Sequence, residues 1–336
     1  FLLNEVNVSK PLIENLYSPI RPYTITERSL KNHMSTTSLL KLLPSVSIKS
    51  YGGRAGVSTI SVHGGQSQRF MVLFDNIPIN NEQNGVSDIS QMPLFLLSSI
   101  QYLPQGLSSR FGKYALTGAL NFSPSQIGTK INMRLGNHND SSIAFMLSKS
   151  ILSNEFIISA GQSKYDAIYD YKEKGNYSLV PYQANTIFKD LKNSINQNFF
   201  YAKINRSFKN RSFMISLFKV QNNRELSTNI YSNRLNNQEM FDDLEVVSMS
   251  KKFNKYNFSV SRKETSIEYL SDLHRLLTYS STLSYTRENF NIQVSSESVI
   301  NRSTKTIDTT KNFYLVSLNQ RTDISKIEIH NSIKFE

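Results

Sequence analysis

Hydrophobic and polar residues alternate at every second position over much of the chain after residue 126. Clear runs of this kind are residues 130–135, 256–261, 290–294 and 326–335. In a β-strand, successive side chains point to opposite faces. Each run therefore predicts a strand with one apolar and one polar face.

The connections between the predicted strands alternate between tight and long. From residue 129 onward the pattern gives about eleven strands. The tight connections are residues 152–155, 209–212, 254–255 and 287–289, and the long ones are residues 165–198 and 222–240. A soluble sandwich buries the apolar faces in a core, whereas a membrane barrel turns them to lipid. Short turns at one rim and long loops at the other favour the barrel.

Aromatic residues near strand ends fit the same interpretation. Tyr and Phe make up 11% of the chain and Trp is absent, so these two types would have to form the aromatic girdles of a barrel. The candidates are Phe156, Phe199, Phe213, Tyr256 and Tyr285. Taken singly, each is equally compatible with an ordinary strand position.

The first 126 residues follow a different pattern. Most of the glycines lie here, together with segments bounded by proline and one helix-like window, "TSLLKLLPSVSI". We expect its leucines to pack before Pro44 ends the helix; they are Leu39, Leu40, Leu42 and Leu43. This half of the chain predicts a compact α+β unit ahead of the strands.

Residues 21 to 123 closely resemble the plug domain of TonB-dependent outer-membrane receptors. The resemblance rests on Pro44-Ser45-Val46, "SYGGRAGVSTISVHGG", "VLFDNIPI", "SSIQYLPQG" and "FGKYALTGALNF", which occur in the family's order. It implies a mainly β protein in which an α+β plug is followed by an antiparallel transmembrane β-barrel. The domains expected are 1–20 (coupling segment and linker), 21–126 (plug) and 127–336 (barrel).

The glycine-rich stretch also has a physical interpretation. Gly52, Gly53 and Gly56 surround Arg54 in a loop that can turn sharply, and Gly112 and Gly118 flank a strand where chains must approach closely. Any one of them alone would be an ordinary turn glycine. Their combined spacing is typical of a plug.

The plug departs from the family pattern at three charged positions. His63, Gln101 and Gln105 stand where the usual plug has Arg, Glu and Arg. Loss of one partner of a buried ion pair is costly, whereas joint loss can be nearly neutral. We therefore expect an intact plug with different ionic contacts, in which gating does not depend on those pairs.

The N-terminal segment "LNEVNVS", residues 3–9, resembles the TonB box that couples such receptors to the energy-transducing protein TonB. The residues that carry the resemblance are Leu3, Glu5, Val6 and Val8. A short strand-competent run of this kind can add to the edge of a partner's sheet through backbone hydrogen bonds. The alternative is an ordinary N-terminal strand.

The resemblance also implies that loops 51–58 and 80–87 are plug apices that face the ligand. Their candidate ligand-binding residues are Tyr51, Arg54, Asn80, Asn81, Gln83 and Asn84. Side-chain amides both donate and accept hydrogen bonds without carrying a charge, so they suit a polar, polydentate ligand. A solvated Asn-rich turn is the alternative.

Other functional classes find less support in the sequence. The net charge of +12 is spread along the chain rather than clustered, which argues against nucleic-acid binding, and there is no cysteine. The five histidines have no metal-ligand spacing, and no catalytic motif is present, so we expect no enzyme activity and no cofactor. Asp166, Asp170 and Glu173 could hold calcium in a loop, but interleaved lysines favour a solvated loop.

The function implied is uptake of a scarce ligand, a corrinoid such as cobalamin or else an iron chelate, across the bacterial outer membrane. The expected partners are TonB, outer-membrane lipid, the small-molecule ligand and a surface lipoprotein. A non-transporting surface binding protein, adhesin or carbohydrate-binding sandwich is the alternative. Single-chain barrels have even strand numbers, and about 22 in transporters of this type, so eleven strands predict an incomplete barrel.

Overall fold

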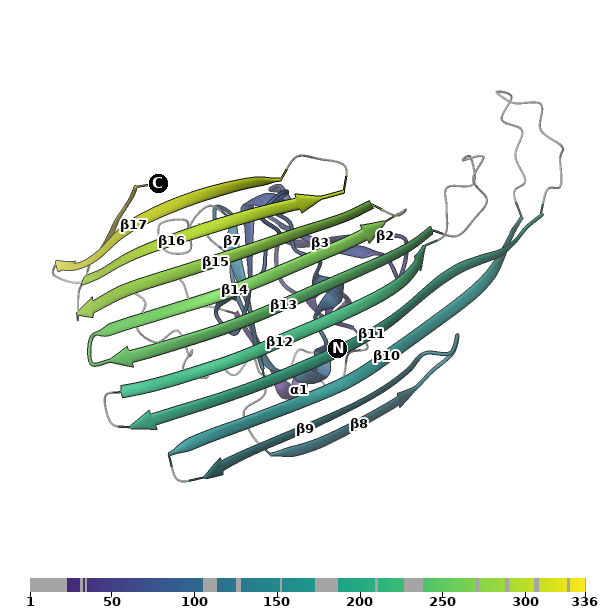
Figure 1. Ribbon diagram of the computed structural model, residues 1–336, viewed down its shortest axis with the longest axis horizontal. Coiled ribbons are helices and arrows are strands. Elements are labelled where there is room, and N and C mark those ends of the chain that lie inside the picture. The colour runs from purple at the N-terminus through teal and green to yellow at the C-terminus, as the bar shows by residue number, and fades with distance from the viewer. Residues whose placement is uncertain are drawn as a thin grey trace.

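Two parts make up the described structure, a small mixed domain and a large curved sheet that runs in front of it in Figure 1. The computed structural model describes residues 23–30, 33, 35–104, 114–124, 128–151, 153–172, 187–208, 211–226, 238–269, 272–287, 290–304, 308–324 and 327–335. Within this part of the chain, no helix has the length and apolar composition of a membrane span.

The N-terminal domain, which we call the plug, contains short helices and two small sheets. Its elements are β1 (Tyr23–Thr26), α1 (Glu27–Leu30), α2 (Thr36–Leu40), β2 (Val46–Tyr51), β3 (Val57–Val62), η1 (Ser67–Arg69), β4 (Phe70–Phe74), β5 (Ile77–Pro78), η2 (Ile89–Gln91), η3 (Leu94–Leu96), β6 (Leu97–Leu103) and β7 (Gly118–Pro124). Strands β1-β6-β7-β4-β5 form one sheet in that order, and β2 and β3 form a separate hairpin.

Helix α2 is shorter than the sequence predicts. Ser35 caps it through a reciprocal capping box with Ser38, and the helix ends at Leu40, well before Pro44. Leu39, Leu40 and Leu43 are buried as expected, whereas the side chain of Leu42 is 55% exposed.

A tight hairpin connects β4 to β5. Its two turn residues, Asp75 and Asn76, have φ values of 48° and 70°, as a type I′ turn requires at both central positions. All five residues of β4 are buried. The turn therefore carries Asp75 out of a buried strand at a fixed position.

Strand β7 approaches β6 so closely that it must begin with glycine. Gly118 has a φ of 142°, and a Cβ atom added there would lie 2.4 Å from the carbonyl oxygen of Leu103. No side chain fits this contact without movement of the backbone.

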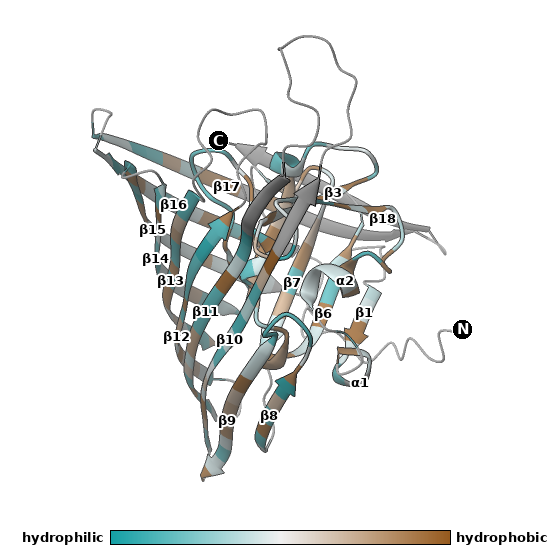
Figure 2. Cartoon of the chain, turned by 90° about the vertical axis from the view of Figure 1, so that its right-hand side faces the viewer, coloured by the Kyte–Doolittle hydropathy of each residue, from teal (hydrophilic) through white to brown (hydrophobic). Residues whose placement is uncertain are grey.

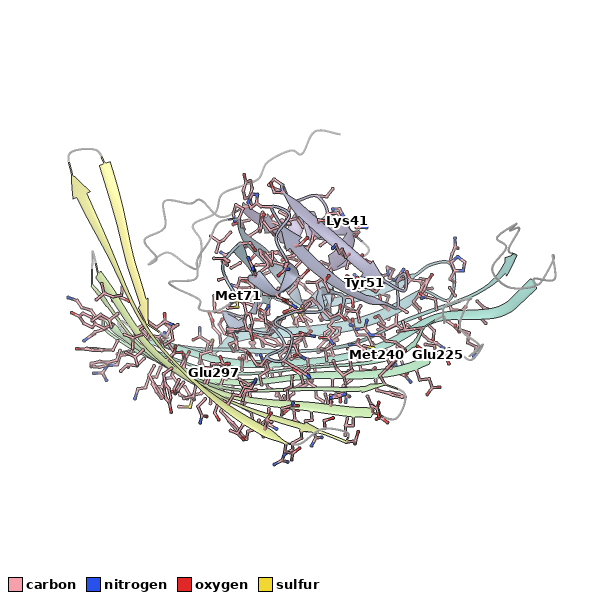
Figure 3. All side chains as sticks on the ribbon, turned by 90° about the horizontal axis from the view of Figure 1, so that it is seen from above. Lys41, Tyr51, Met71, Glu225, Met240 and Glu297 are labelled. Carbon is pink, nitrogen blue, oxygen red and sulfur yellow. The ribbon has the colours of Figure 1, made fainter. Side chains whose placement is uncertain are left out.

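Within the described residues, the second part is one antiparallel sheet of eleven strands, which confirms the prediction from sequence. The strands are β8 (Thr129–Leu135), β9 (Ser141–Ile151), β10 (Asn154–Lys172), β11 (Ile187–Phe208), β12 (Arg211–Leu226), β13 (Gln238–Phe253), β14 (Tyr256–Tyr269), β15 (Asp272–Arg287), β16 (Phe290–Ser303), β17 (Thr309–Ile324) and β18 (Ile327–Phe335). They pair in chain order, so β8 and β18 form the two edges. The sheet curves around the plug, which sits in its hollow (Figures 2 and 3).

The two faces of the sheet differ in the way expected of a barrel wall. The outward face carries exposed apolar side chains: Ile131, Met133, Phe145, Leu147, Phe156, Ile158, Ile204, Ile215, Met249, Phe258 and Leu283. The inward face carries buried polar ones: Asn193, Gln197, Lys203, Ser216, Asn222, Arg224, Asp242, Ser248, Lys263 and Thr278. An apolar outside and a polar inside are what lipid on one side and a plug on the other require.

Two expectations about the strand ends are wrong. Residues 165–172, 187–198, 222–226 and 238–240 belong to strands rather than loops, and the rest of the two long connections, 173–186 and 227–237, lies outside the described residues. Phe199 faces inward and is 8% exposed, so it is no part of an outer girdle. Tyr256 and Tyr285 do pair across neighbouring strands, 5.0 Å between ring centroids, beside the tight turn at 254–255.

The plug and the barrel wall share one hydrophobic core. Phe74 of β4 stacks on Phe218 of β12 with a centroid separation of 3.9 Å, and meets Tyr201 of β11 edge-on at 5.6 Å. Aromatic pairs in such geometries attract beyond the area they bury. The plug is therefore packed against the wall as well as enclosed by it.

Candidate functional site

The most distinctive polar feature is a row of ion pairs between the plug and the inner wall. Three plug carboxylates, Asp75, Glu82 and Asp88, meet three basic side chains of the sheet. We call this set the clamp, namely Asp75–Lys203, Glu82–Lys263 and Asp88–Arg224. All three carboxylates come from one stretch of 14 residues that follows β4.

Asp75, at the tip of the β4–β5 hairpin, binds two side chains of β11. The ammonium group of Lys203 donates to both carboxylate oxygens, at 3.0 and 2.9 Å, and the Tyr201 hydroxyl donates to Oδ2 at 3.0 Å. Lys203 and Asp75 are 7% and 8% exposed. Since Tyr201 and Lys203 are two residues apart on one strand, they share the inward face.

Glu82 is held between β14 and the plug itself. Lys263 donates to its Oε1 and the Tyr114 hydroxyl donates to its Oε2, each at 2.7 Å. Both ends of the ion pair are buried, with 4% and 3% of the side chains exposed. Burial, and then the Glu82 carboxylate, raise the pKa of Tyr114, so this hydroxyl remains a hydrogen-bond donor.

Arg224 of β12 is the centre of the third contact and is completely buried. It donates to Asp242 of β13 from Nε at 2.7 Å, and to Asp88 from Nη2 at 2.7 Å. Its Nη1 donates to the Ala55 carbonyl and to the Ser90 hydroxyl, both at 3.1 Å. One guanidinium thus connects the 51–58 loop, and the segment directly after the 80–87 loop, to the wall.

The glycine-rich loop 51–56 is attached to the wall near the rim that carries the longer connections, which we call the long-loop rim. Arg54 forms two bonds to Asp140, at 2.6 and 2.7 Å, and lies over the ring of Tyr165 at 4.7 Å. Asn193 accepts from the Ala55 backbone N–H at 3.1 Å. A Cβ atom on Gly56 would lie 1.6 Å from the Tyr51 carbonyl oxygen, so this turn needs glycine.

Asn80, predicted to contact a ligand, has a structural role instead. Its side chain is 0% exposed. The amide donates to the carbonyls of Phe70 and Gly85, at 2.9 and 2.8 Å, and accepts from the Val72 N–H at 2.8 Å. We expected the Asn80 side chain to be exposed at the apex. That expectation is wrong, because the amide makes the hydrogen bonds to the backbone of β4 that a neighbouring strand would otherwise make.

The rest of the 80–87 loop divides into residues that shape it and residues that face outward. The Asn81 side chain accepts from the backbone N–H of Gln83, at 2.8 Å, and Asn84 accepts from that of Val86, at 2.9 Å. Gln83 and Asn84 are exposed, and Tyr51 is 58% exposed. Figure 3 shows Tyr51 on the plug, with Met240 and Glu225 on the facing sheet.

Several predicted positions lie elsewhere. Gln105, Glu173 and Leu3, Glu5, Val6 and Val8 of the candidate TonB box fall outside the residues that the structure describes. Asp166 and Asp170 belong to β10 rather than to a loop, and among the described residues no group of three acidic, His or Cys side chains could hold a metal ion.

Two of the atypical plug positions are described. His63 is exposed, and its Nε2–H donates to the Pro104 carbonyl at 2.8 Å. Gln101 is 2% exposed, and its Oε1 is buried without a hydrogen-bond partner.

Sequence analysis did not identify the clamp, neither its carboxylates nor its basic side chains. Lys203, Arg224 and Lys263 look like ordinary members of a basic chain. The available signal was their place in the alternation, because each occupies an inward-facing position where its strand neighbours on that face are apolar or neutral. A charge at such a position needs a buried partner.

A comparison with known families decides what this arrangement is. Residues 18–119 match the TonB-dependent Receptor Plug Domain. These residues therefore form the plug domain of a TonB-dependent receptor. The protein is located in the bacterial outer membrane, in agreement with the apolar outer face of its sheet.

Individual proteins similar to this chain include a vitamin B12 transporter and an iron transporter. The chain is 27% identical over 180 residues to the vitamin B12 transporter BtuB of Vibrio vulnificus, an alignment of 51% of this chain and 29% of that protein. Its fold matches the FrpB iron transporter of Neisseria meningitidis with a TM-score of 0.72 at 13% identity, covering 94% of this chain and 57% of that one.

A second solved structure, the ferric enterobactin receptor PfeA of Pseudomonas aeruginosa, gives a TM-score of 0.67 at 10% identity. The match covers 95% of this chain and 57% of PfeA. The receptor chain thus spans just over half the length of these structures, which agrees with an incomplete barrel of eleven strands.

Proposed function

We propose that the receptor binds a corrinoid such as cobalamin at the plug apices and passes it into the periplasm when TonB pulls on the N-terminal segment. The observation that carries this proposal is the electrical neutrality of the apices. The cations that contact the two apex loops, Arg54, Arg224 and Lys263, are each bound to a carboxylate. Apart from Arg54, which is paired with Asp140, the exposed side chains of the apices are amides and a phenol.

A neutral surface of this kind suits a neutral ligand that carries amide groups. Corrinoids carry such groups. An iron chelate with net negative charge would be recognised through cations that are free to meet it. The similarity to a vitamin B12 transporter supports the same ligand class. Outer-membrane lipid around the apolar face and a surface lipoprotein over the long-loop rim complete the proposed partners.

Replacement of Gln83 by alanine should weaken corrinoid binding without disturbing the plug. Gln83 is exposed, whereas Asn81 shapes the loop, so the Gln83 change is the cleaner of the two. A lost hydrogen bond to a neutral group costs about 0.5–1.5 kcal/mol, roughly a two- to tenfold rise in Kd. Titration calorimetry with cyanocobalamin measures it.

The matched control is Asn257→Ala, which removes an exposed amide at the opposite rim. It should leave the Kd unchanged. If Gln83→Ala binds as tightly as the parent protein, the ligand site lies on the barrel loops rather than at this apex.

Transport is tested by removing the candidate TonB box. Deletion of residues 3–9 should abolish uptake of labelled cyanocobalamin by intact cells, because TonB then has no segment to bind. Binding of cyanocobalamin at the cell surface should persist. Uptake at the parental rate would leave a surface binding protein as the better description. Mass spectrometry of molecules that co-purify with the receptor from native membranes identifies the ligand directly.

A further inference from the structure

Two arginines lie side by side on the outward face of the sheet, toward the long-loop rim. Arg275 of β15 is directly opposite Arg302 of β16, on neighbouring strands (Figure 1). Both side chains are exposed. Arg275 shares its face with the exposed Tyr279 and Leu283, which lie an even number of residues along the strand. Because like charges directly opposite each other on a sheet repel, this pair is unfavourable unless an anion lies between the two guanidinium groups.

The apolar surface next to this pair has the height of a membrane core. Tyr285, which pairs with Tyr256 beside the tight turn at 254–255, marks the edge of that surface at the tight-turn rim. Arg275 lies ten positions from Tyr285 along β15, roughly 33 Å at 3.3 Å per residue. A strand tilted by about 40° spans roughly 25 Å of membrane over that length, the usual height of the apolar band. The arginine pair therefore lies where the headgroups of the outer leaflet begin.

The charged side chains nearer the middle of the apolar band are paired with one another. Arg262 of β14 binds Glu245 of β13 at 2.8 Å and also binds Glu264 of its own strand. Lys219 of β12 lies 3.6 Å from the other oxygen of Glu245. Charges that approach lipid need such partners.

This compensation does not extend to the whole arginine pair. Nε of Arg275 lies 3.0 Å from Glu264, whereas Arg302 forms no ion pair with any residue that the structure describes. Glu268 and Asp308 follow toward the long-loop rim, and in the described part of the chain neither forms an ion pair with the two arginines. A positive charge therefore stays unmatched at the level of the headgroups.

We propose that Arg275 and Arg302 bind the phosphate group of an outer-leaflet glycolipid, whose acyl chains lie along the apolar surface below them. Phosphorylated glycolipids form the outer leaflet of this membrane, and basic side chains at headgroup level recognise such groups. Guanidinium groups bind phosphate through paired hydrogen bonds, so one phosphate removes the repulsion between the two arginines. Leu277 and Ile300, the next outward pair toward the lipid, contact the chains. The site concerns the membrane and does not depend on which ligand is transported.

Native mass spectrometry of the full-length receptor in detergent tests this site with bis-phosphorylated lipid A and with the same lipid after removal of its phosphates. We expect the parent receptor to retain the phosphorylated form in preference. Arg275→Gln with Arg302→Gln should lower that retention about tenfold or more, because charge-assisted hydrogen bonds are lost. The dephosphorylated lipid should bind both proteins equally. Arg302→Gln alone should lower retention without lowering the unfolding temperature, because it breaks no ion pair within the described chain.

The matched control is Arg206→Gln with Arg211→Gln, which removes two exposed arginines near the tight-turn rim. It should leave the retention of lipid A unchanged. Equal retention by the parent and by the Arg275 and Arg302 double variant overturns the proposal. Equal retention of both lipid forms by the parent does so too, since the apolar surface alone would then hold the lipid. Displacement of the lipid by an equal concentration of inorganic phosphate also overturns it, because the pair would then recognise a free anion.

Discussion

Arg224→Ala should unfold or undock the plug, with a loss of about 3–5 kcal/mol, because the change leaves Asp88 and Asp242 as buried carboxylates without their cation. The guanidinium also holds the Ala55 carbonyl and the Ser90 hydroxyl, so the 51–58 loop and the segment after the 80–87 loop should loosen. Thermal unfolding of the purified receptor in detergent measures the loss. In cells, an undocked plug should admit a large hydrophilic antibiotic that the outer membrane otherwise excludes.

The control for this change removes the acids together with the base. Arg224→Met with Asp88→Asn and Asp242→Asn leaves no uncompensated charge, and should unfold much nearer to the parent than Arg224→Ala does. An Arg224→Ala receptor with parental stability and antibiotic resistance would show that the contact does not hold the plug.

Lys203→Ala should have an effect of similar size on the opposite end of the clamp. It leaves Asp75 without its cation in a site where 8% of the side chain is exposed and, among the described residues, only the Tyr201 hydroxyl remains as a side-chain donor. Truncation of one partner of a buried pair typically costs about 3–5 kcal/mol. We expect a lower unfolding temperature, and Asp75 at the hairpin tip to become accessible to proteases.

The double change Lys203→Met with Asp75→Asn separates the ion pair from the hairpin itself. Asn retains the positive φ that the turn demands and still accepts from Tyr201, so most of the lost stability should return. If the double variant is no more stable than Lys203→Ala, the loss of stability comes from the lost packing of the lysine side chain rather than from the unpaired charge of Asp75.

The strands of the sheet could be predicted from sequence wherever one face meets lipid. There the alternation is strict, as from Lys130 to Leu135. It fades toward the long-loop rim: β11 begins at Ile187 but carries Asn193, Ser194, Asn196 and Gln197 on both faces. Above the lipid, both faces of a strand meet polar surroundings, so periodicity cannot reveal the strand and it is mistaken for a loop.

The candidate site was predicted only in outline. The resemblance directed attention to loops 51–58 and 80–87, but residue type alone could not separate Asn80, whose amide binds the backbone of β4, from Gln83, which is exposed. The ionic contacts depend on which strands face the plug and on where along each strand the charged residue lies. That information arises only when the sheet curves around the plug and brings Arg224 to Asp88, 136 residues away in the chain.

The contrast between the buried clamp and the partly exposed Arg54 that binds Asp140 has a consequence for how the protein meets changes in salinity. Dissolved ions screen charges that water can reach, over about 8–10 Å at ordinary ionic strength, and screen enclosed pairs far less. In brackish or saline surroundings the clamp should keep its strength while the Arg54–Asp140 contact weakens. Rising salt should therefore loosen the attachment of loop 51–56 to the wall while the plug stays docked.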